Sequence, residues 1–448
     1  MCVYIDTILQ YRYLIDMNVL AEELNNTLEG TIAGRMLSKV GRRIYFPKGI
    51  IAQSTEAKKA AFKANATIGM AFSHGSPLLM SVIKDAMPVF KPSEIVAYAP
   101  TAGVEEARLA WKDLLSQKNP SITEHISLPV VVSGLTAGIS LTATLFLDEE
   151  QTILASAPCW DNYELIFQER YGAFLKEIPF FNGSDTGLDI DSIEKDILKQ
   201  AETGVVRIIL NFPNNPSGYS PTIEEAEKLI GLFKDVADRG ADVLVICDDA
   251  YFGLFYEDHI IQESLFCQLS TLHERILVVK IDGPTKEDYA WGLRMGFMTF
   301  GSKGLTAVHY DALVKKLMGA IRSTVSCANT PAQYLMLKTM NDPRTPAEKD
   351  EYFNILRNRY LAVKKIVSIH AEDRNLRALP FNSGYFMSFH CVGVKAEALR
   401  RRLLARGVGV VALGDAYLRI AFSSIEEEDI PSIYQLIYEE AAALGDYL

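Results

Sequence analysis

The sequence predicts an α/β fold, in which a large domain holds a mostly parallel seven-stranded sheet between helices and a smaller α+β domain lies beside it. Between residues 128 and 300, short runs of apolar, β-branched residues alternate with longer stretches of helical spacing. Most of the short runs are apolar at nearly every position rather than at every second residue. Such runs are typical of parallel strands that helices cover on both faces.

The alternating region supplies the large domain, which we expect over residues 77–335. Its strands are predicted at 129–133, 152–157, 174–180, 205–212, 242–248, 276–281 and 295–300, and its helices at 78–90, 104–117, 137–147, 162–171, 188–201, 223–239 and onward from 304.

The remaining segments are assigned to the smaller domain and to an N-terminal lead-in. Residues 47–76 and 336–448 are expected to form the small domain, and residues 1–46 a lead-in or arm. The small domain should contain helices at 47–63, 351–370, 396–406 and 426–444, and strands at 65–72, 382–391 and 409–424.

Composition narrows the class of protein. The chain has 448 residues, of which 49% are hydrophobic and 23% charged, with a formal net charge of −11. A nucleic-acid-binding protein usually carries a basic face, and no dense Lys/Arg block occurs here. No run of about 18 apolar residues is present to span a membrane. We therefore expect a protein that binds neither nucleic acid nor a membrane.

The six cysteines are scattered, without the close pairs of a metal site. In a chain of this length, such cysteines favour reduced thiols in a reducing compartment. The N-terminus carries Asp6 and lacks a basic segment leading into an apolar one, so a signal peptide is not expected. The predicted location is cytoplasmic, and no metal site is predicted.

Lys286 follows a predicted strand and the turn Asp282-Gly283-Pro284. A lysine at a strand end can be desolvated and act as a Schiff-base amine, although a lone lysine there is more often a solvated loop residue. Arg294 precedes the next strand and should lie close to Lys286. The remainder of the sequence has to decide between these two interpretations.

Polar and aromatic residues also follow the other strands, at the sheet edge where open α/β sheets bind ligands. Gly134 opens a helix whose N-terminus suits a phosphate, or serves as an ordinary cap. Trp160 could stack on a flat cofactor or lie in the core. Asn215 offers an amide from a rigid Asn-Pro-rich turn. Asp248 ends an apolar strand, so it needs a partner such as a protonated ring nitrogen, unless it caps a helix.

The ordered set of these motifs resembles one family. The motifs are Asn-x-Pro-x-Asn-Pro-Ser-Gly, then Asp-x-Ala-Tyr, Thr-Lys and Gly-x-Arg-x-Gly, in segments 211–218, 248–251, 285–286 and 292–296. Together they resemble the pyridoxal-phosphate-dependent aminotransferases of fold type I, in the class that contains the aspartate and aromatic enzymes. The resemblance spans about residues 48–424.

The resemblance implies a role for each matching residue around pyridoxal 5'-phosphate. Lys286 matches the lysine that forms the Schiff base, and Asp248 the carboxylate paired with the ring nitrogen. The other implied cofactor residues are Tyr251 and Asn215 at the ring's phenolic oxygen, Trp160 over the ring, and Gly134, Leu135, Thr285 and Arg294 at the phosphate, with Tyr98 reaching the phosphate of a neighbouring subunit. The implied assembly is a homodimer with shared active sites.

The substrates implied are an L-amino acid and a 2-oxo acid. Arg419 matches the arginine that binds the substrate's α-carboxylate, and Gly69 matches a backbone contact beside it. Asn215 is implied as a further substrate-binding residue. Arg322 lies near the position of an arginine that binds a side-chain carboxylate in aspartate-type enzymes, and the other interpretation is a helix-end residue at a dimer surface.

The chain departs from the family at the lysine turn. Gly283 stands where the family usually has a phosphate-binding serine, and Thr285 is the expected substitute. Glu287 and Asp288 place two acidic residues directly after Lys286. Two other lysines, at 280 and 303, lack the spacing to Arg294 that marks the Schiff-base lysine.

Three functions remain open from the sequence. The first is an aminotransferase, the second a carbon–sulfur β-lyase that uses the same lysine, and the third a non-catalytic cofactor-binding regulator. A regulator of that kind carries a DNA-binding head, and residues 1–48 show no clear helix-turn-helix. The aminotransferase is the prediction, and the sequence does not name the amino donor.

Overall fold

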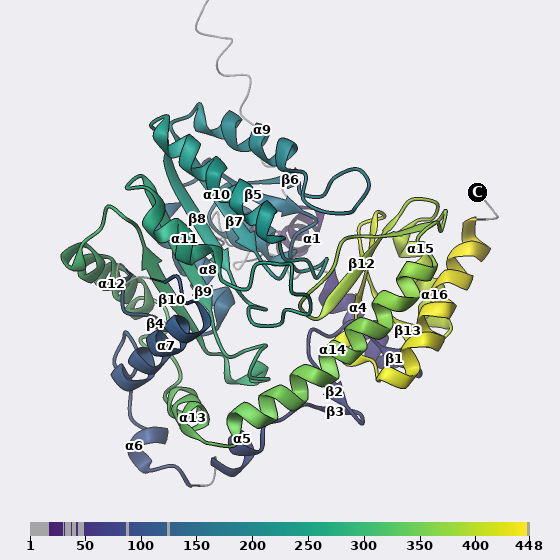
Figure 1. Cartoon of the computed structure of the whole chain (residues 1–448), viewed down its shortest axis with the longest axis horizontal. Helices are drawn as coiled ribbons and strands as arrows, with labels where there is room; N and C mark the ends of the chain where they lie inside the picture. Colours follow the sequence, from purple (N-terminus) through teal and green to yellow (C-terminus); the bar gives the residue numbers. More distant parts are fainter. Residues whose placement is uncertain are drawn as a thin grey trace, which may run out of the picture.

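The computed structural model describes residues 18–29, 31, 37, 42–43, 49–86, 89–122 and 126–445. Most of the predicted lead-in at 1–46 lies outside the described residues, apart from α1 (Val19–Leu28) and a few single positions. Figure 1 shows a large α/β part joined to a smaller part that holds its own sheet. No helix among the described residues combines the length and the apolar character needed to cross a bilayer.

The large part is built on a seven-stranded sheet with the order β4-β10-β9-β8-β7-β5-β6. The strands from β9 to β6 run parallel to one another, and only β10 is antiparallel to its two neighbours, β4 and β9. The predicted mostly parallel sheet is confirmed. The strands are β4 (Val130–Val132), β5 (Thr152–Ala157), β6 (Phe174–Pro179), β7 (Val205–Asn211), β8 (Asp242–Asp248), β9 (Ile276–Asp282) and β10 (Gly296–Gly301).

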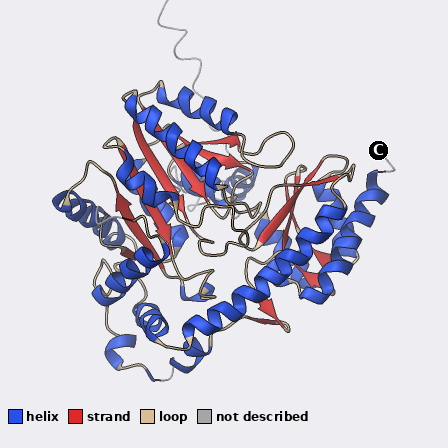
Figure 2. Ribbon diagram, in the orientation of Figure 1, coloured by secondary structure: helices blue, strands red, loops and turns tan. Residues whose placement is uncertain are grey.

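Helices cover both faces of this sheet (Figure 2). Along β8, Val245 packs into a core with Leu229 of α10, whereas Ile246 faces the opposite core with Ile139 of α8. Both faces are therefore buried along this strand, which explains why its central residues are apolar on both sides. The helices are α7 (Glu105–Lys118), α8 (Leu135–Phe146), the π-helix η3 (Glu164–Arg170), α9 (Ile190–Ala201), α10 (Ile223–Asp238), α11 (Leu265–Leu272) and α12 (Ala307–Arg322).

The smaller part centres on an antiparallel sheet with the order β11-β12-β15-β14. Its strands are β11 (Leu376–Ala378), β12 (Phe386–Cys391), β14 (Val411–Leu413) and β15 (Tyr417–Ala421), and its helices are α4 (Ile50–Ala60), α14 (Thr345–Ile369), α15 (Ala396–Ala405) and α16 (Ile430–Gly445). β1 (Ala64–Asn65) pairs with β13 (Val408–Gly409), which brings the early segment to the C-terminal part of the chain.

The two parts share an apolar core. Tyr256, from the loop after β8, stacks on Tyr360 of α14 with 4.9 Å between ring centroids. Tyr251 and Leu254 belong to the same cluster as Tyr434 of α16. The remaining elements are β2 (Phe72–Ser73), β3 (Ser76–Pro77), α5 (Ser81–Ala86), α6 (Pro92–Ile95), α13 (Thr330–Asn341) and the 3-10 turns η4 (Trp291–Leu293), η5 (Phe422–Ser424) and η6 (Glu427–Asp429).

Some predicted elements differ from the structure. The expected strand at 65–72 survives only as the ends of β1 and β2, with turns between them that bring the backbone of Gly69 to Lys286. α11 was not predicted, because its eight residues are shorter than the window over which helical spacing is clear. α14 begins at Thr345, six residues before the predicted start, since Pro346 occupies its first turn.

Candidate active site

A cavity of about 240 Å³ opens at the carboxyl ends of β7, β8 and β9. Parallel strands collect their ligand-binding residues at this edge. Most of the predicted cofactor residues lie on its wall together. Its lining comprises Leu135, Thr136, Ile139, Trp160, Asn211, Asn215, Asp248, Ala250, Tyr251, Thr285, Lys286 and Arg294.

Lys286 presents its amine to this cavity. Its Nζ donates to the carbonyl oxygen of Gly69 at 3.2 Å and lies 5.0 Å from the ring centroid of Tyr251. Burial lowers the pKa of Lys286 to about 8, and the positive charges of Arg294 and Arg419 act in the same direction. About a tenth of the amine is therefore neutral, and nucleophilic, at pH 7.

Asp248 ends β8 with its carboxylate buried. The hydroxyl of Tyr163 donates to Oδ2 at 2.6 Å, whereas Oδ1 is buried without a hydrogen-bond partner. Burial raises the pKa of Asp248 to about 6, against the hydrogen bond from Tyr163, which favours the charged form. Because a buried carboxylate oxygen needs a donor, Oδ1 marks a position for a ligand N–H group.

A chain of hydrogen bonds links Asp248 to Arg419. The side chain of Asn211 donates to the carbonyl of Asp248 at 2.7 Å and accepts from the backbone N–H of Asn215 at 2.7 Å. The amide oxygen of Asn215 in turn accepts from Nη1 of Arg419 at 3.1 Å. This leaves the Nδ2 donor of Asn215 available to the cavity.

Arg419 is 3% exposed and lies on β15 of the smaller sheet. Its Nη2 donates to the carbonyl of Thr67 at 3.1 Å, its guanidinium carbon lies 4.4 Å from the ring centroid of Phe386, and its Nε is buried without a partner. A rigid guanidinium with a free donor suits a carboxylate ligand.

An anion cradle forms where α8 begins. Gly134, with φ 89°, is the N-cap of α8 and makes no side-chain cap. A Cβ at Gly134 would lie 2.7 Å from Nη2 of Arg294, so only a glycine lets the guanidinium reach the helix N-terminus. Leu135 supplies the first backbone N–H, and the Thr285 hydroxyl donates to the Met295 carbonyl at 3.3 Å. Positive charge and free N–H groups meet here, as a phosphate requires.

The missing serine at Gly283 has a steric cause. A Cβ at Gly283 would lie 2.9 Å from the Cα of Gly296 and 3.0 Å from the carbonyl oxygen of Met295. β10 approaches the turn too closely for any side chain. The acidic pair that follows Lys286 also does not line the cavity: Glu287 and Asp288 form ion pairs with lysines of α7 and α14.

The rival lysines are placed elsewhere. Lys280 is fully buried and forms ion pairs with Asp249 and Asp282, the second at 3.5 Å. Lys303 lies exposed on the loop after β10. Neither residue lines the cavity that holds Lys286.

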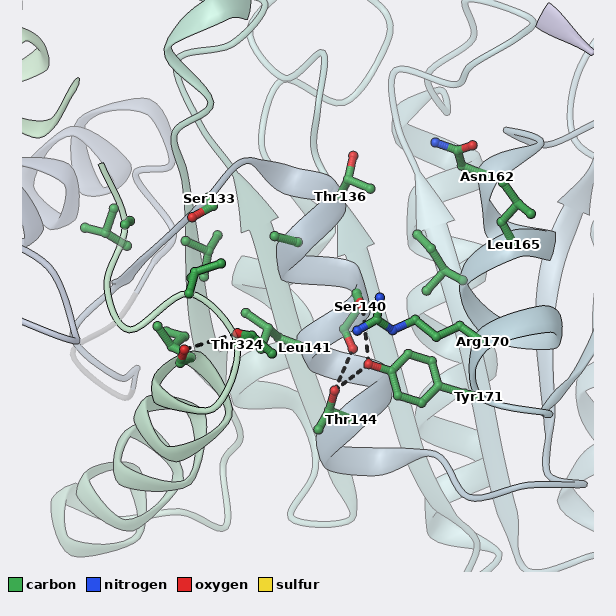
Figure 3. A pocket seen from close by; sticks show the side chains of 17 residues that line it. Ser133, Thr136, Ser140, Leu141, Thr144, Asn162, Leu165, Arg170, Tyr171 and Thr324 are labelled. Carbon is green, nitrogen blue, oxygen red and sulfur yellow. Dashed lines mark hydrogen bonds between the residues drawn. The ribbon is translucent and has the colours of Figure 1, made fainter. Parts of the chain in front are cut away.

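Tyr98 and Arg322 lie apart from the cavity. Tyr98 is 91% exposed, and Arg322 is exposed at the end of α12. The neighbours of Arg322, Ile321 and Val325, line a second cavity of about 520 Å³. Figure 3 shows this cavity between α8, α12 and η3, where the hydroxyl of Tyr171 lies at hydrogen-bonding distance from Thr144.

Three contributors were missed by sequence reasoning. Tyr163 holds Asp248, Asn211 joins Asp248 to Asn215, and Tyr385 donates to the carbonyl oxygen of Lys286 at 2.7 Å. Asn211 stands inside the Asn-Pro motif, so the motif carried a signal for it. Tyr163 and Tyr385 act across 85 and 99 residues of sequence, and no local pattern marks such pairs.

The fold and cavity define an α/β enzyme with a nucleophilic lysine, a buried carboxylate and an anion cradle at one sheet edge. Residues 67–437 match the family model of the class I and II aminotransferases, and the chain belongs to this family. The family uses pyridoxal 5'-phosphate to move an amino group between an amino acid and a 2-oxo acid, so the predicted function is confirmed at this level. The β-lyase and regulator alternatives are not favoured.

Curated relatives agree with this membership. The chain is 24% identical over 357 residues to a probable aspartate/prephenate aminotransferase of Aquifex aeolicus, covering 76% of this chain and 82% of the relative. It is 25% identical over 354 residues to an aspartate aminotransferase of Thermococcus kodakarensis, covering 78% and 82%. The fold matches an aminotransferase structure from Anaerococcus prevotii with TM-score 0.80, 23% identity and coverage of 91% and 99%.

Proposed function

We propose that this aminotransferase holds pyridoxal 5'-phosphate in the cavity around Lys286 and transfers the amino group of an L-amino acid there. The orphaned Oδ1 of Asp248 carries this proposal, because it fits the protonated ring nitrogen of that cofactor. The cradle of Gly134, Leu135, Thr285 and Arg294 fits its phosphate.

The proposed roles follow from what each side chain does. Bound pyridoxal phosphate supplies the electron sink for the substrate's α-carbon. Asp248 keeps a proton on the ring nitrogen, since its charged form favours a cation beside it. Tyr251 and Asn215 donate hydrogen bonds to negative charge on the ring's oxygen, and Trp160 packs over the ring face.

Lys286 is the proposed general base and acid. Its neutral amine accepts the proton from the substrate's α-carbon, and the protonated amine then donates that proton to the carbonyl carbon of the cofactor. A pKa of about 8 suits both steps near neutral pH, because the amine then exists in both forms. The turn on which it lies keeps Nζ on the cavity wall, next to the Gly69 carbonyl.

Arg419 is the proposed anchor for the substrate's α-carboxylate. Its buried guanidinium is held by Asn215 and Thr67, and its partnerless Nε leaves donor capacity for the ligand. Two parallel hydrogen bonds fix the orientation of a carboxylate, and hence which α-bond faces Lys286. The backbone of Gly69 lies beside this position.

We also propose a homodimer with shared sites, located in the cytoplasm. The exposure of Ile95, Val96 and Tyr98, at 45%, 80% and 91%, supports the dimer, because such a group of exposed apolar side chains is typical of a protein interface. In this arrangement Tyr98 reaches the neighbour's phosphate. Arg322 is proposed to bind an acidic side chain of the substrate, and the alternative is a helix-end arginine at the dimer surface. The five described cysteines are free, in keeping with a reducing compartment. We retain 1–46, 47–76 with 336–448, and 77–335 as proposed domain limits.

A panel of amino acids with 2-oxoglutarate tests the reaction. The cofactor-loaded protein should form glutamate with at least one donor and need the acceptor for turnover. Pyruvate and ammonia released without an acceptor would instead identify a β-lyase, and the absence of any cofactor spectral change would identify a regulator. Lys286→Ala should abolish borohydride-trapped cofactor, and trapping that survives would overturn the assignment.

A further inference from the structure

The acidic pair Glu287 and Asp288 lies on the turn that carries Lys286. The backbone N–H of Asp288 donates to the carbonyl of Pro284 at 3.1 Å, and that of Tyr289 to the carbonyl of Lys286 at 3.3 Å. Tyr289 has φ 54°, a left-handed conformation that is rare for a tyrosine. A turn with such a conformation persists only where its surroundings hold it.

Two lysines from separate helices neutralise the acidic pair. Lys118 is the last residue of α7 and forms an ion pair with Glu287. Lys349, in the first turns of α14, lies 2.7 Å from Oδ1 of Asp288 and 3.4 Å from Oε1 of Glu287. The four side chains are between 5% and 23% exposed, so this is a largely buried, neutral network rather than a set of surface pairs.

The network also contacts the loop that carries Tyr251. Gly253 has φ 94°, and a Cβ there would lie 2.7 Å from the carboxyl group of Glu287. Burial disfavours ionisation of Glu287, but Lys118 and Lys349 outweigh it and leave its pKa lowered. Glu287 is therefore an anion wedged between α7, α14 and the Tyr251 loop.

α14 reaches from the seven-stranded side of the molecule to the smaller sheet (Figure 1). Beside Lys349, Tyr352 of α14 packs edge-on against Tyr289 with 5.2 Å between ring centroids. On the other side, Tyr385 donates to the carbonyl of Lys286 at 2.7 Å. The turn is thus held by residues of the smaller part of the molecule, which also supplies Arg419.

We propose that Glu287 and Asp288 are positioning residues, which hold Lys286 on the cavity wall by tying its turn to α7 and α14 through Lys118 and Lys349. This inference rests on the proposed role of Lys286. It accounts for the departure at 287 and 288: the two carboxylates serve the backbone of the lysine turn and make no contact with the phosphate cradle. Displacing a reacting group by about 1 Å can lower a rate roughly a hundredfold, so we expect a shift of Lys286 after loss of the network to lower the rate strongly.

The test compares the doubly neutral variant E287Q/D288N with wild type and with D311N, which removes one partner of the exposed Asp311–Lys315 pair on α12. We expect E287Q/D288N to lower two rates by roughly tenfold to a hundredfold: kcat, and the rate at which the protein captures cofactor in a form that borohydride traps. We expect KM to change by less than about threefold. D311N should match wild type. Equal rates in E287Q/D288N and wild type would overturn the proposal.

Lys349 provides a second, independent set of variants. K349R should retain most of the capture rate and K349M should lose it. Because unpaired buried charges can unfold a protein, the fully neutral variant K118Q/E287Q/D288N/K349Q keeps the test valid; it should fold and still capture cofactor slowly. A rate that falls only in proportion to the unfolded fraction would reduce the network to a stabilising role and overturn the proposal.

Hydrogen exchange separates this proposal from the proposed function. If wild type captures no cofactor, the proposed function fails. Hydrogen exchange at the amides of Asp288 and Tyr289 then shows whether the ion-pair network holds the lysine turn. Faster exchange at these two amides in E287Q/D288N, with exchange at the amides of β8 unchanged, supports the proposed link between the lysine turn and the two helices. Unchanged protection at both places contradicts it.

Discussion

At the residue scale, the chemistry depends on two groups of one cavity whose pKa values are shifted, the Lys286 amine and the Asp248 carboxyl group. Lys286 is made less basic by burial and by two arginines, whereas burial makes Asp248 less acidic. The lowered pKa of Lys286 favours the neutral amine that attacks, whereas the raised pKa of Asp248 works against the charged carboxylate that holds a cation. Tyr163, which is distant from Asp248 in sequence, lowers the pKa of Asp248 by donating a hydrogen bond to its carboxylate.

The rate of cofactor capture should follow the titration of Lys286. Only the neutral amine attacks, and with a pKa of about 8 its neutral fraction rises from about 1% at pH 6 to about 90% at pH 9. Stopped-flow absorbance of cofactor-free protein measures this, with a free lysine analogue in the same buffers as the control. A rate that still rises about sevenfold between pH 9 and pH 10, as the analogue's does, would show an unshifted lysine.

Removing the Tyr163 hydroxyl should weaken the ionised form of Asp248. Its hydrogen bond favours the carboxylate, so Tyr163→Phe raises the pKa of Asp248 further and leaves more of it protonated as the pH falls. We expect kcat/KM to fall by roughly tenfold or more, as for the loss of a charged hydrogen bond, and more at pH 6 than at pH 9. A pH profile of kcat/KM measures this; a loss equal at all pH values would contradict it.

At the element scale, the long apolar strands were predictable from the sequence, whereas short pairings between distant segments were not. β5, β7, β8 and β9 are apolar on both faces, so the runs at 152–157, 205–212, 242–248 and 276–281 stood out from the sequence. The residues that follow them reach one cavity for the same reason, since parallel strands end at one edge. Short pairings such as β1 with β13 join segments more than 340 residues apart and leave no local pattern.

The turn before Lys286 should tolerate no side chain at position 283. Gly283→Ala places its Cβ against the backbone of Gly296, which we expect to destabilise the fold by about 1–3 kcal/mol. Gly292→Ala is the matched control, because nothing lies within 4 Å of its added Cβ. Thermal unfolding of both variants tests this. Equal melting temperatures would show that β10 can move away from the turn.

At the scale of the whole molecule, the proposed shared site predicts complementation between subunits. Lys286→Ala and Tyr98→Ala should each be impaired alone. In a mixed dimer one site carries both changes and the other carries neither, so half of the mixed dimers' sites are intact. Co-refolded at equal amounts, the two variants should recover about a quarter of wild-type activity. Activity no higher than the average of the parents would contradict a shared site.

The tyrosine stack between Tyr256 and Tyr360 has a thermodynamic consequence for the molecule. Because one apolar cluster joins the loop after β8 to α14 and α16, we expect the two parts of the molecule to unfold together. Heating should therefore give a single calorimetric peak whose van 't Hoff and calorimetric enthalpies agree. Bound cofactor, although it contacts mainly the seven-stranded side, should shift that whole peak upward and leave no separate early transition.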